Sequence, residues 1–282
     1  MKTFNNREEK QVGYIELNKV SDIVLDDKHW LKDYYKIIFI EGCGQLTIDF
    51  VEYRFHRDTL FFFSIDQHLI INDAVSGKIL FFNADFYCVA FHDKELACDG
   101  LLFDNVFEFP FVNLLQDQRR KFQDLFISIK DEINQKDFWR DEMIKSYIKQ
   151  IIIHATRNLV FDKRVSSGTI PYDLDFARKF SQLVERYYRE YHNVSDYAKM
   201  LNVTPKTLNR KIVREKQATP NNIIKQRIIL QAKRLLTNTS ISIKEIADYL
   251  GYKDYSYFIR FFKIQTGTSP LLFRESINIS TT

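Results

Sequence analysis

Residues 243–263 read IKEIADYLGYKDYSYFIRFFK, and residues 194–214 read VSDYAKMLNVTPKTLNRKIVR, a second stretch of the same construction. The matched positions lie 49 to 50 residues apart and pair apolar with apolar residues, arginine with arginine and proline with proline. In order, Leu201, Leu208, Arg210, Ile212, Thr219 and Pro220 match Leu250, Phe258, Arg260, Phe262, Ser269 and Pro270. Each copy predicts a short helix, a tight turn and a second helix. This is the outline of a helix-turn-helix, whose second helix enters the major groove of DNA.

The first copy has start signals for both of its helices. Residues 194–201 predict the supporting helix, with Asn193 as its N-cap and Asp196 favourable in its first turn. Thr204 and Pro205 then begin the second helix, as a hydroxyl cap followed by proline at the first helical position. This helix would place Leu208 and Ile212 inward and leave Lys206, Thr207, Asn209, Arg210 and Lys211 outward, where they suit contacts to bases or phosphates.

The second copy begins with a capping box formed by Ser242 and Glu245. Gly251 allows the sharp turn, and Asp254 can cap the second helix. Between the copies, residues 221–236 predict a helix of about 24 Å, a spacer that would hold the two second helices in groove segments about 34 Å apart. The second helix would direct Phe258 and Phe262 inward and Tyr255, Ser256, Tyr257, Ile259, Arg260 and Lys263 outward.

Charge is distributed unevenly along the chain. Residues 171–282 contain 19 Lys and Arg against 10 Asp and Glu, whereas residues 1–170 contain 22 against 27. A basic part joined to an acidic one indicates that the C-terminal part alone binds a polyanion. Because surface charge is also uneven by chance in many proteins, the repeat carries more weight than the charge.

The bulk composition sets the class of protein. A chain of 282 residues fits two domains, and 45% hydrophobic with 28% charged residues is typical of a soluble globular protein. The longest apolar runs, such as residues 60–63, fall far short of the roughly 18 residues that a membrane span requires. Residues 1–10 lack the apolar core of a signal peptide, and three cysteines do not make a disulfide scaffold. We therefore expect a cytoplasmic protein.

In the N-terminal part, the spacing of apolar residues changes once, from a pattern typical of strands to one typical of helices. Short strands are predicted over residues 34–41, 46–50, 58–64, 68–72 and 78–83, with Gly42 and Gly44 in a hairpin, which indicates a small antiparallel sandwich or barrel. Apolar residues at three- and four-residue spacing then predict helices over 122–133 and 138–159. The longer helix would put Trp139, Met143 and Tyr147 on its apolar side, and would either cover the sheet or pair with its twin in a dimer.

The C-terminal part resembles the AraC/XylS family of bacterial transcription regulators over about 100 residues. The resemblance is carried by AKRLL (232–236), IKEIADYLGY (243–252), DYSYFIRFFK (254–263), GTSP (267–270) and Phe273-Arg274. It implies two helix-turn-helix units joined by a helix, with base readers at Lys206, Asn209, Arg210, Tyr255, Ser256 and Arg260. Gln217 departs from the glycine that the family usually has, as at Gly267, and puts the turn geometry of the first unit in doubt. Ile259 stands at a position that is often polar, so the second helix would read fewer bases or contact a thymine methyl group.

The same resemblance implies the partners. They are double-stranded DNA with a bipartite promoter site, RNA polymerase, a small-molecule effector and a second copy of the chain in a homodimer, with no membrane and no cofactor. Activation is the commoner role in the family, and we expect it here over repression.

Residues 34–86 are similar in pattern to the cupin-type β-barrel that often precedes this DNA-binding domain. In such regulators the barrel binds a small effector or mediates dimerisation. The aromatic residues that would line an effector pocket, or else form plain core, are Trp30, Tyr35, Phe39, Phe61, Phe63, Phe82 and Phe86.

An enzymatic function has less support. Metal-binding cupins cluster histidines with a carboxylate, but the strand region has only His56 and His68, and the chain has no His-x-His pair. Cys88, His92 and Cys98 would need a fourth ligand to bind zinc, and two buried thiols are the simpler interpretation. The alternatives are a cupin-type enzyme, a cysteine-based sensor fused to a DNA-binding domain, and a non-specific architectural DNA binder.

The sequence thus predicts an α+β protein of two domains that is not an enzyme. Residues 1–160 are expected to form a cupin-like antiparallel β-barrel with two flanking helices, which senses an effector or dimerises. Residues 161–174 form a linker with glycine and proline. Residues 175–282 are expected to be an all-α DNA-binding domain of two helix-turn-helix units joined by a linker helix.

Overall fold

The computed structural model describes residues 11–20, 23–24, 31, 33–65, 67–87, 102–103, 109–167 and 173–280. The strands in this part of the chain are β1 (Val12–Val20), β2 (Ile23–Val24), β3 (Tyr35–Glu41), β4 (Gly44–Ile48), β5 (Val51–Phe55), β6 (Thr59–Phe63), β7 (Leu69–Ile71), β8 (Val75–Phe82) and β9 (Phe111–Asn113). The helices are α2 (Gln116–Ile133), α3 (Arg140–Ser167), α4 (Asp173–Tyr187), α5 (Val194–Met200), α6 (Pro205–Lys216), α7 (Pro220–Asn238), α8 (Ile243–Tyr249), α9 (Tyr255–Thr266) and α10 (Pro270–Ser280).

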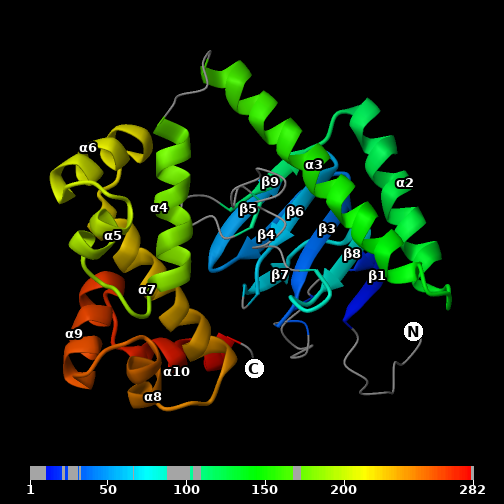
Figure 1. Ribbon diagram of the computed structural model, residues 1–282. Coiled ribbons are helices and arrows are strands. Elements are labelled where there is room, and N and C mark those ends of the chain that lie inside the picture. Colours follow the sequence, from blue (N-terminus) through cyan, green and yellow to red (C-terminus); the bar gives the residue numbers. More distant parts are fainter. Residues whose placement is uncertain are drawn as a thin grey trace. The chain divides into compact units, whose positions relative to one another are not determined.

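The chain divides into two compact parts, with a boundary between Val165 and Ser166. The β-domain holds every described strand together with α2 and most of α3, and the helical domain holds α4 to α10 (Figure 1). The predicted α+β class with two domains is therefore confirmed.

The strands of the β-domain form two antiparallel sheets. One has the order β1-β8-β3-β6-β9 and the other the order β2-β7-β4-β5. Within the described residues these are two separate hydrogen-bonded sheets and not one closed barrel. Four strands, β1, β2, β5 and β9, were not among those predicted from the sequence.

The central strands β3 and β6 are buried on both faces, which explains their unbroken apolar runs IIFI and LFFF. One face packs on α2, where the Phe39 and Phe126 ring centroids lie 5.8 Å apart. The other face meets the second sheet, where Phe61 lies edge-on to Phe55 of β5 at 5.4 Å. Figure 1 shows α2 and α3 along one side of the strands.

Helix α2 buries the apolar residues that its periodicity predicts, Phe122, Leu125, Phe126 and Ile129. On α3 the buried side is Ile144, Ile148, Ile151, Ile152 and Ala155. The expectation that Trp139 and Met143 share this side is wrong, because they are 67% and 40% exposed. Trp139 lies in the turn before α3, so helical periodicity does not place it.

Helix α3 continues to Ser167, into the segment where the sequence predicts a linker. Residues 161–167 contain neither glycine nor proline, and Gly168 and Pro171 are the first residues that oppose a helix. Residues 168–172 lie outside the described part of the chain.

Candidate nucleic-acid interface

The duplicated sequence of the helical domain folds as a duplicated structure. The supporting helices α5 and α8 each have seven residues, and the expected recognition helices α6 and α9 each have twelve. Helix α9 follows α6 by 50 residues, whereas α8 follows α5 by 49, because the turn of the second unit is one residue longer.

The two turns share one backbone hydrogen bond. The amide of Val203 donates to the carbonyl of Ala198 at 2.9 Å, and the amide of Tyr252 donates to the carbonyl of Ala247, also at 2.9 Å. A residue in the left-handed conformation precedes each of these amides. This is the Schellman arrangement that satisfies carbonyls at the end of a helix. The repeat therefore extends to the backbone geometry of the turns.

Helix α6 begins as predicted. The Thr204 hydroxyl accepts a hydrogen bond from the Thr207 amide at 3.2 Å, and Pro205 is the first helical residue. Leu208 and Ile212 are fully buried, which turns the opposite face of α6 to solvent. The predicted residues exposed on α6 are Lys206, Asn209 and Arg210.

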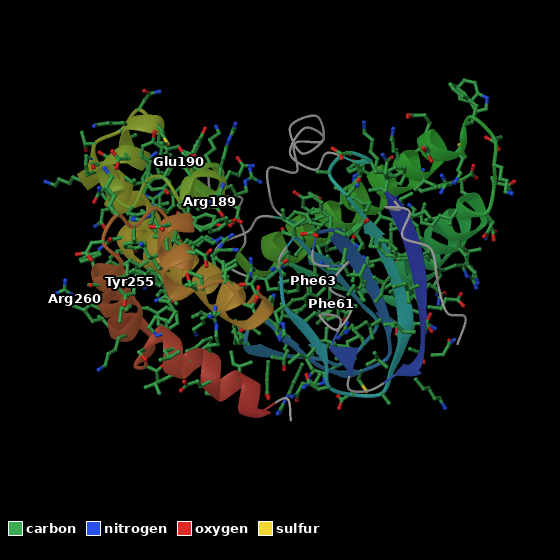
Figure 2. All side chains as sticks on the ribbon, turned by 90° about the horizontal axis from the view of Figure 1, so that it is seen from below. Phe61, Phe63, Arg189, Glu190, Tyr255 and Arg260 are labelled. Atoms are coloured by element: carbon green, nitrogen blue, oxygen red, sulfur yellow. The ribbon has the colours of Figure 1, made fainter. Side chains whose placement is uncertain are left out.

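Helix α9 is capped by Asp254, whose carboxylate accepts hydrogen bonds from the amides of Ser256 at 2.8 Å and Tyr257 at 3.2 Å. Phe258 and Phe262 are fully buried. The exposed residues, two of which are labelled along α9 in Figure 2, are Tyr255, Ser256, Tyr257, Arg260 and Lys263. Ile259 is half-buried between them.

The capping box of α8 is also confirmed. The Ser242 hydroxyl accepts from the Glu245 amide at 3.2 Å, and the Glu245 carboxylate accepts from the Ser242 amide at 2.7 Å. Hydrogen bonds from the side chain and backbone of Ser242 to the carboxylate hold the pKa of Glu245 below its usual value. The negative carboxylate thus stays at the N-terminus of the helix, where the helix dipole favours it.

Two predicted residues take other positions, and a third lacks its predicted hydrogen bond. Thr207 is half-buried, and its hydroxyl accepts from the Thr204 cap at 3.0 Å. Lys211 is half-buried with its ammonium 4.4 Å from the Phe176 ring centroid of α4, so it is turned toward the protein. Asn193 occupies the N-cap position of α5, but its side chain makes no capping hydrogen bond.

The exposed faces extend beyond the predicted residues. Val213 and Arg214 follow Arg210 by three and four positions and are exposed, with Arg214 3.4 Å from Glu215. On α9, Ile264 follows Arg260 by four positions and is 78% exposed. Helical spacing from the two arginines would have found them. Val213 and Ile264 were missed because an apolar residue beside buried positions is usually core.

Helix α7 joins the two units and is longer than the predicted 221–236. The Thr219 hydroxyl accepts from the Asn222 amide at 3.2 Å to cap it. Its Arg227, 7% exposed, donates to both carboxylate oxygens of Glu185 on α4, at 2.5 and 2.6 Å. The guanidinium also lies 4.0 Å from the Tyr188 ring centroid. This bidentate pair, between a buried arginine and a half-buried glutamate, fixes α7 against α4.

One hydrophobic cluster underlies both helix-turn-helix units. It contains, among others, Phe180, Leu208, Ile224, Leu250 and Phe258, each at 0% exposure. Residues from α4, α6, α7 and α9 therefore share one core, so the recognition helices belong to a single packed body.

The predicted effector residues of the β-domain lie on two opposite faces of the five-stranded sheet. Tyr35 stacks on its cross-strand partner Phe82 at 5.8 Å, and Phe39 packs on α2. Phe61 and Phe63 project toward the second sheet (Figure 2). Phe39, Phe61, Phe63 and Phe82 are at most 1% exposed and Phe86 is 4% exposed, as core residues are. Trp30 lies outside the described residues.

No group of three or more His, Cys, Asp or Glu side chains within the described ranges could hold a metal ion. Cys88, His92 and Cys98 lie outside those ranges. Among the helices that the structure describes, none is both long and apolar enough to cross a membrane.

Comparison with known proteins places a family in the helical domain. Residues 197–276 match the family described as "Helix-turn-helix domain". The chain is also 33% identical over 82 residues to the Bacillus subtilis (strain 168) protein named "Uncharacterized HTH-type transcriptional regulator YfiF", a match that covers 29% of this chain. The matched segment spans about a quarter (26%) of that relative's length.

Solved structures align with the chain at low TM-scores. The C-terminal domain of AraT, a response regulator from Geobacillus stearothermophilus, is 28% identical, with coverage of 35% of this chain and 82% of that one and a TM-score of 0.33. Unsaturated fatty acid-bound ToxT from Vibrio cholerae is 18% identical, with coverage of 93% and 94% and a TM-score of 0.43. The family match coincides with the duplicated helices described above, and residues 197–276 form a helix-turn-helix domain of the AraC type.

Proposed function

We propose that this chain regulates transcription by binding a bipartite site on double-stranded DNA through α6 and α9. The observation that carries the proposal is the equivalence of Arg210 and Arg260. They lie 50 residues apart in sequence, at the same position of two capped twelve-residue helices, and both are exposed. Arginine at such a position can donate two hydrogen bonds to one guanine edge.

The chemistry of the two faces supports base reading by both. Helix α6 offers Lys206, Asn209 and Arg210, and α9 offers Ser256 and Arg260 with Tyr255 at its start. Lysine and arginine suit guanine, asparagine suits adenine, and serine accepts or donates to either. The exposed Val213 and the half-buried Ile259 add apolar surface suited to a thymine methyl group.

Selection of genomic DNA tests this function. The purified full chain is incubated with sheared DNA from its source at near-physiological salt, and the retained fragments are sequenced. We expect one enriched motif with two halves about one helical turn apart. The double variant Arg210→Ala/Arg260→Ala is the control and should lose the motif. Retention without any enriched sequence, fading uniformly as salt rises, would instead indicate a non-specific binder.

We further propose that the β-domain senses a small-molecule effector or holds a homodimer together, and that the bound protein recruits RNA polymerase to activate transcription. The support is that the strands, α2 and α3 form a compact part apart from the DNA-binding helices. Light scattering on the full chain tests the dimer. Transcription in vitro from the recovered promoter tests activation, and fewer transcripts on adding the protein would make it a repressor.

A further inference from the structure

Besides α7 and the shared core, a further connection joins the two helix-turn-helix units. It is made by residues 188–193, the segment between α4 and α5, which meets the turn between α8 and α9. The His192 Nε2 atom lies 3.0 Å from the Leu250 carbonyl oxygen. The His192 ring also lies 4.7 Å, centroid to centroid, from the ring of Tyr252.

Arg189 adds two contacts to the same turn. Its guanidinium lies 4.7 Å from the ring centroid of Tyr249, the last residue of α8. Its carbonyl oxygen lies so close to Gly251 that a Cβ atom there would come within 2.0 Å of it. Only glycine therefore fits at position 251, both because its φ is +79° and because the Arg189 carbonyl fills the space.

The 188–193 segment is itself braced on its other side. The Tyr188 ring packs under Arg227 of α7, and the Tyr197 hydroxyl of α5 donates to the Tyr191 carbonyl at 2.8 Å. A displacement of the segment would therefore strain both of these contacts. The segment is a fixed part of the first unit that touches the second unit directly.

We propose that His192 and Arg189 form a clamp that sets the distance and angle between the recognition helices α6 and α9, and so the half-site spacing that the protein accepts. The inference rests on the proposed function for its effect on DNA. The shared core and α7 already pack the two units together. A further attachment, at the turn between α8 and α9, restricts the remaining freedom of one unit to rotate against the other. The two units are thereby ordered relative to each other in the free protein, so less conformational entropy is lost when they bind DNA.

The arrangement of the units can be measured without DNA. Spin labels at Asn209→Cys and Lys263→Cys, both exposed, report the distance between α6 and α9 by double electron–electron resonance, with the three native cysteines changed to serine. We expect one narrow distance in the parent, a broadened or shifted one in His192→Ala, and recovery in His192→Gln, whose amide N–H₂ can donate to Leu250. The control is His154→Ala, a half-buried histidine of α3 in the β-domain.

A second pair of variants separates the clamp from backbone strain. Asn202 and Gly251 hold equivalent positions in the two turns, with φ of +53° and +79°. Alanine is disfavoured in the left-handed conformation at both positions, and more so relative to glycine than to asparagine. Only Gly251→Ala also drives a Cβ into Arg189. We therefore expect Gly251→Ala to change the label distance and Asn202→Ala to leave it unchanged.

Binding to DNA tests the consequence. One base pair inserted between the half-sites moves them by about 3.4 Å and about 35°. The parent should lose affinity for DNA on this insertion. His192→Ala should bind the original site roughly tenfold more weakly than the parent, because linking two modules in a fixed arrangement can add a hundredfold or more to affinity. The variant should also discriminate less between the two spacings. Unchanged label distances in His192→Ala overturn the clamp. Changed distances with unchanged spacing preference overturn its role in spacing. A failure to find any DNA motif defeats the proposed function, while the label distances still decide the clamp.

Discussion

The Nε2 atom of His192 lies 3.0 Å from the carbonyl oxygen of Leu250, which is 58 residues further along the chain. Burial lowers the pKa of His192 below its ordinary value of 6.5, against the opposite effect of the backbone carbonyls of Leu250, Tyr188 and Arg189. The neutral ring has a single N–H, which can be donated to the Leu250 carbonyl when it is on Nε2.

We therefore predict that His192 is neutral at pH 7 with its proton on Nε2, and that it titrates below 6.5. Because the unfolded chain then binds this proton more readily than the folded one, stability should fall as pH drops below about 6.5. Long-range ¹H–¹⁵N NMR correlations of the full chain would report the tautomer and the midpoint, with His192→Gln to assign the signal. A midpoint above 6.5 would show that the three carbonyls outweigh burial.

The two matched arginines give a prediction about specificity. Arg260→Ala should cost about 1–3 kcal/mol of binding free energy at one half of the site and relax base preference there, with Arg210→Ala doing the same at the other half. Affinities for the recovered site and for sites mutated in one half would measure this. Equal losses on specific and random DNA would make these arginines phosphate contacts.

Lys211 should behave differently from these arginines. Because its ammonium packs on Phe176, Lys211→Ala should lower the stability of the helical domain and leave the salt dependence of DNA binding largely unchanged. Thermal unfolding and affinities at several salt concentrations would separate the two effects. A salt slope reduced by about one would identify a phosphate contact after all.

The C-caps of α6 and α9 offer a matched test of backbone strain. Gln217 and Gly267 both adopt the left-handed conformation, with φ of +52° and +82°. The turn geometry is therefore retained in the first unit despite the glutamine, at a conformational cost. Gln217→Gly should stabilise the protein and Gly267→Ala should destabilise it, each by about 1 kcal/mol. A Cβ at Gly267 meets no atom within 4 Å, so steric clash would not confuse the comparison. Opposite signs for the two variants in chemical denaturation would bear this out.

The helical domain was predictable because its signals are local. Caps such as Thr204, Asp254 and the Ser242–Glu245 box act within four residues, and the repeat supplies an internal check on each. The clamp was not predictable, because a lone histidine carries no sign of a partner 58 residues away.

The β-domain was harder for the same reason. Strand β9 has three residues and owes its position to pairing with β6, about 50 residues earlier in the chain. In β1, the Phe81 ring lies over Gly13, where a Cβ would come within 2.2 Å of it, and this glycine weakens the strand pattern in the sequence. Without the register of the strands, the sequence does not show which face of the five-stranded sheet packs on α2 and which packs on the second sheet.

The bidentate pair of Arg227 and Glu185 gives the last prediction. Arg227→Ala removes both charge-assisted hydrogen bonds to the half-buried Glu185 carboxylate, so it should destabilise the helical domain by about 1.5–3 kcal/mol. Arg227→Lys should not restore stability, because an ammonium cannot reproduce the two parallel hydrogen bonds of the guanidinium fork.

The positions of the two tryptophans allow the loss of stability in Arg227→Ala to be assigned to one of the two domains. Both tryptophans, Trp30 and Trp139, precede the helical domain in sequence, so their fluorescence does not report on its helices directly. Hydrogen exchange of peptides from α4 and α7 should accelerate in Arg227→Ala, while the tryptophan fluorescence transition stays where it is. An accelerated exchange confined to α7, with α4 unaffected, would mean that the pair stabilises its own helix and does not join the two. If α4 and α7 loosen together, the ion pair is what fixes the linker helix against α4, and with it the frame on which both recognition helices are held.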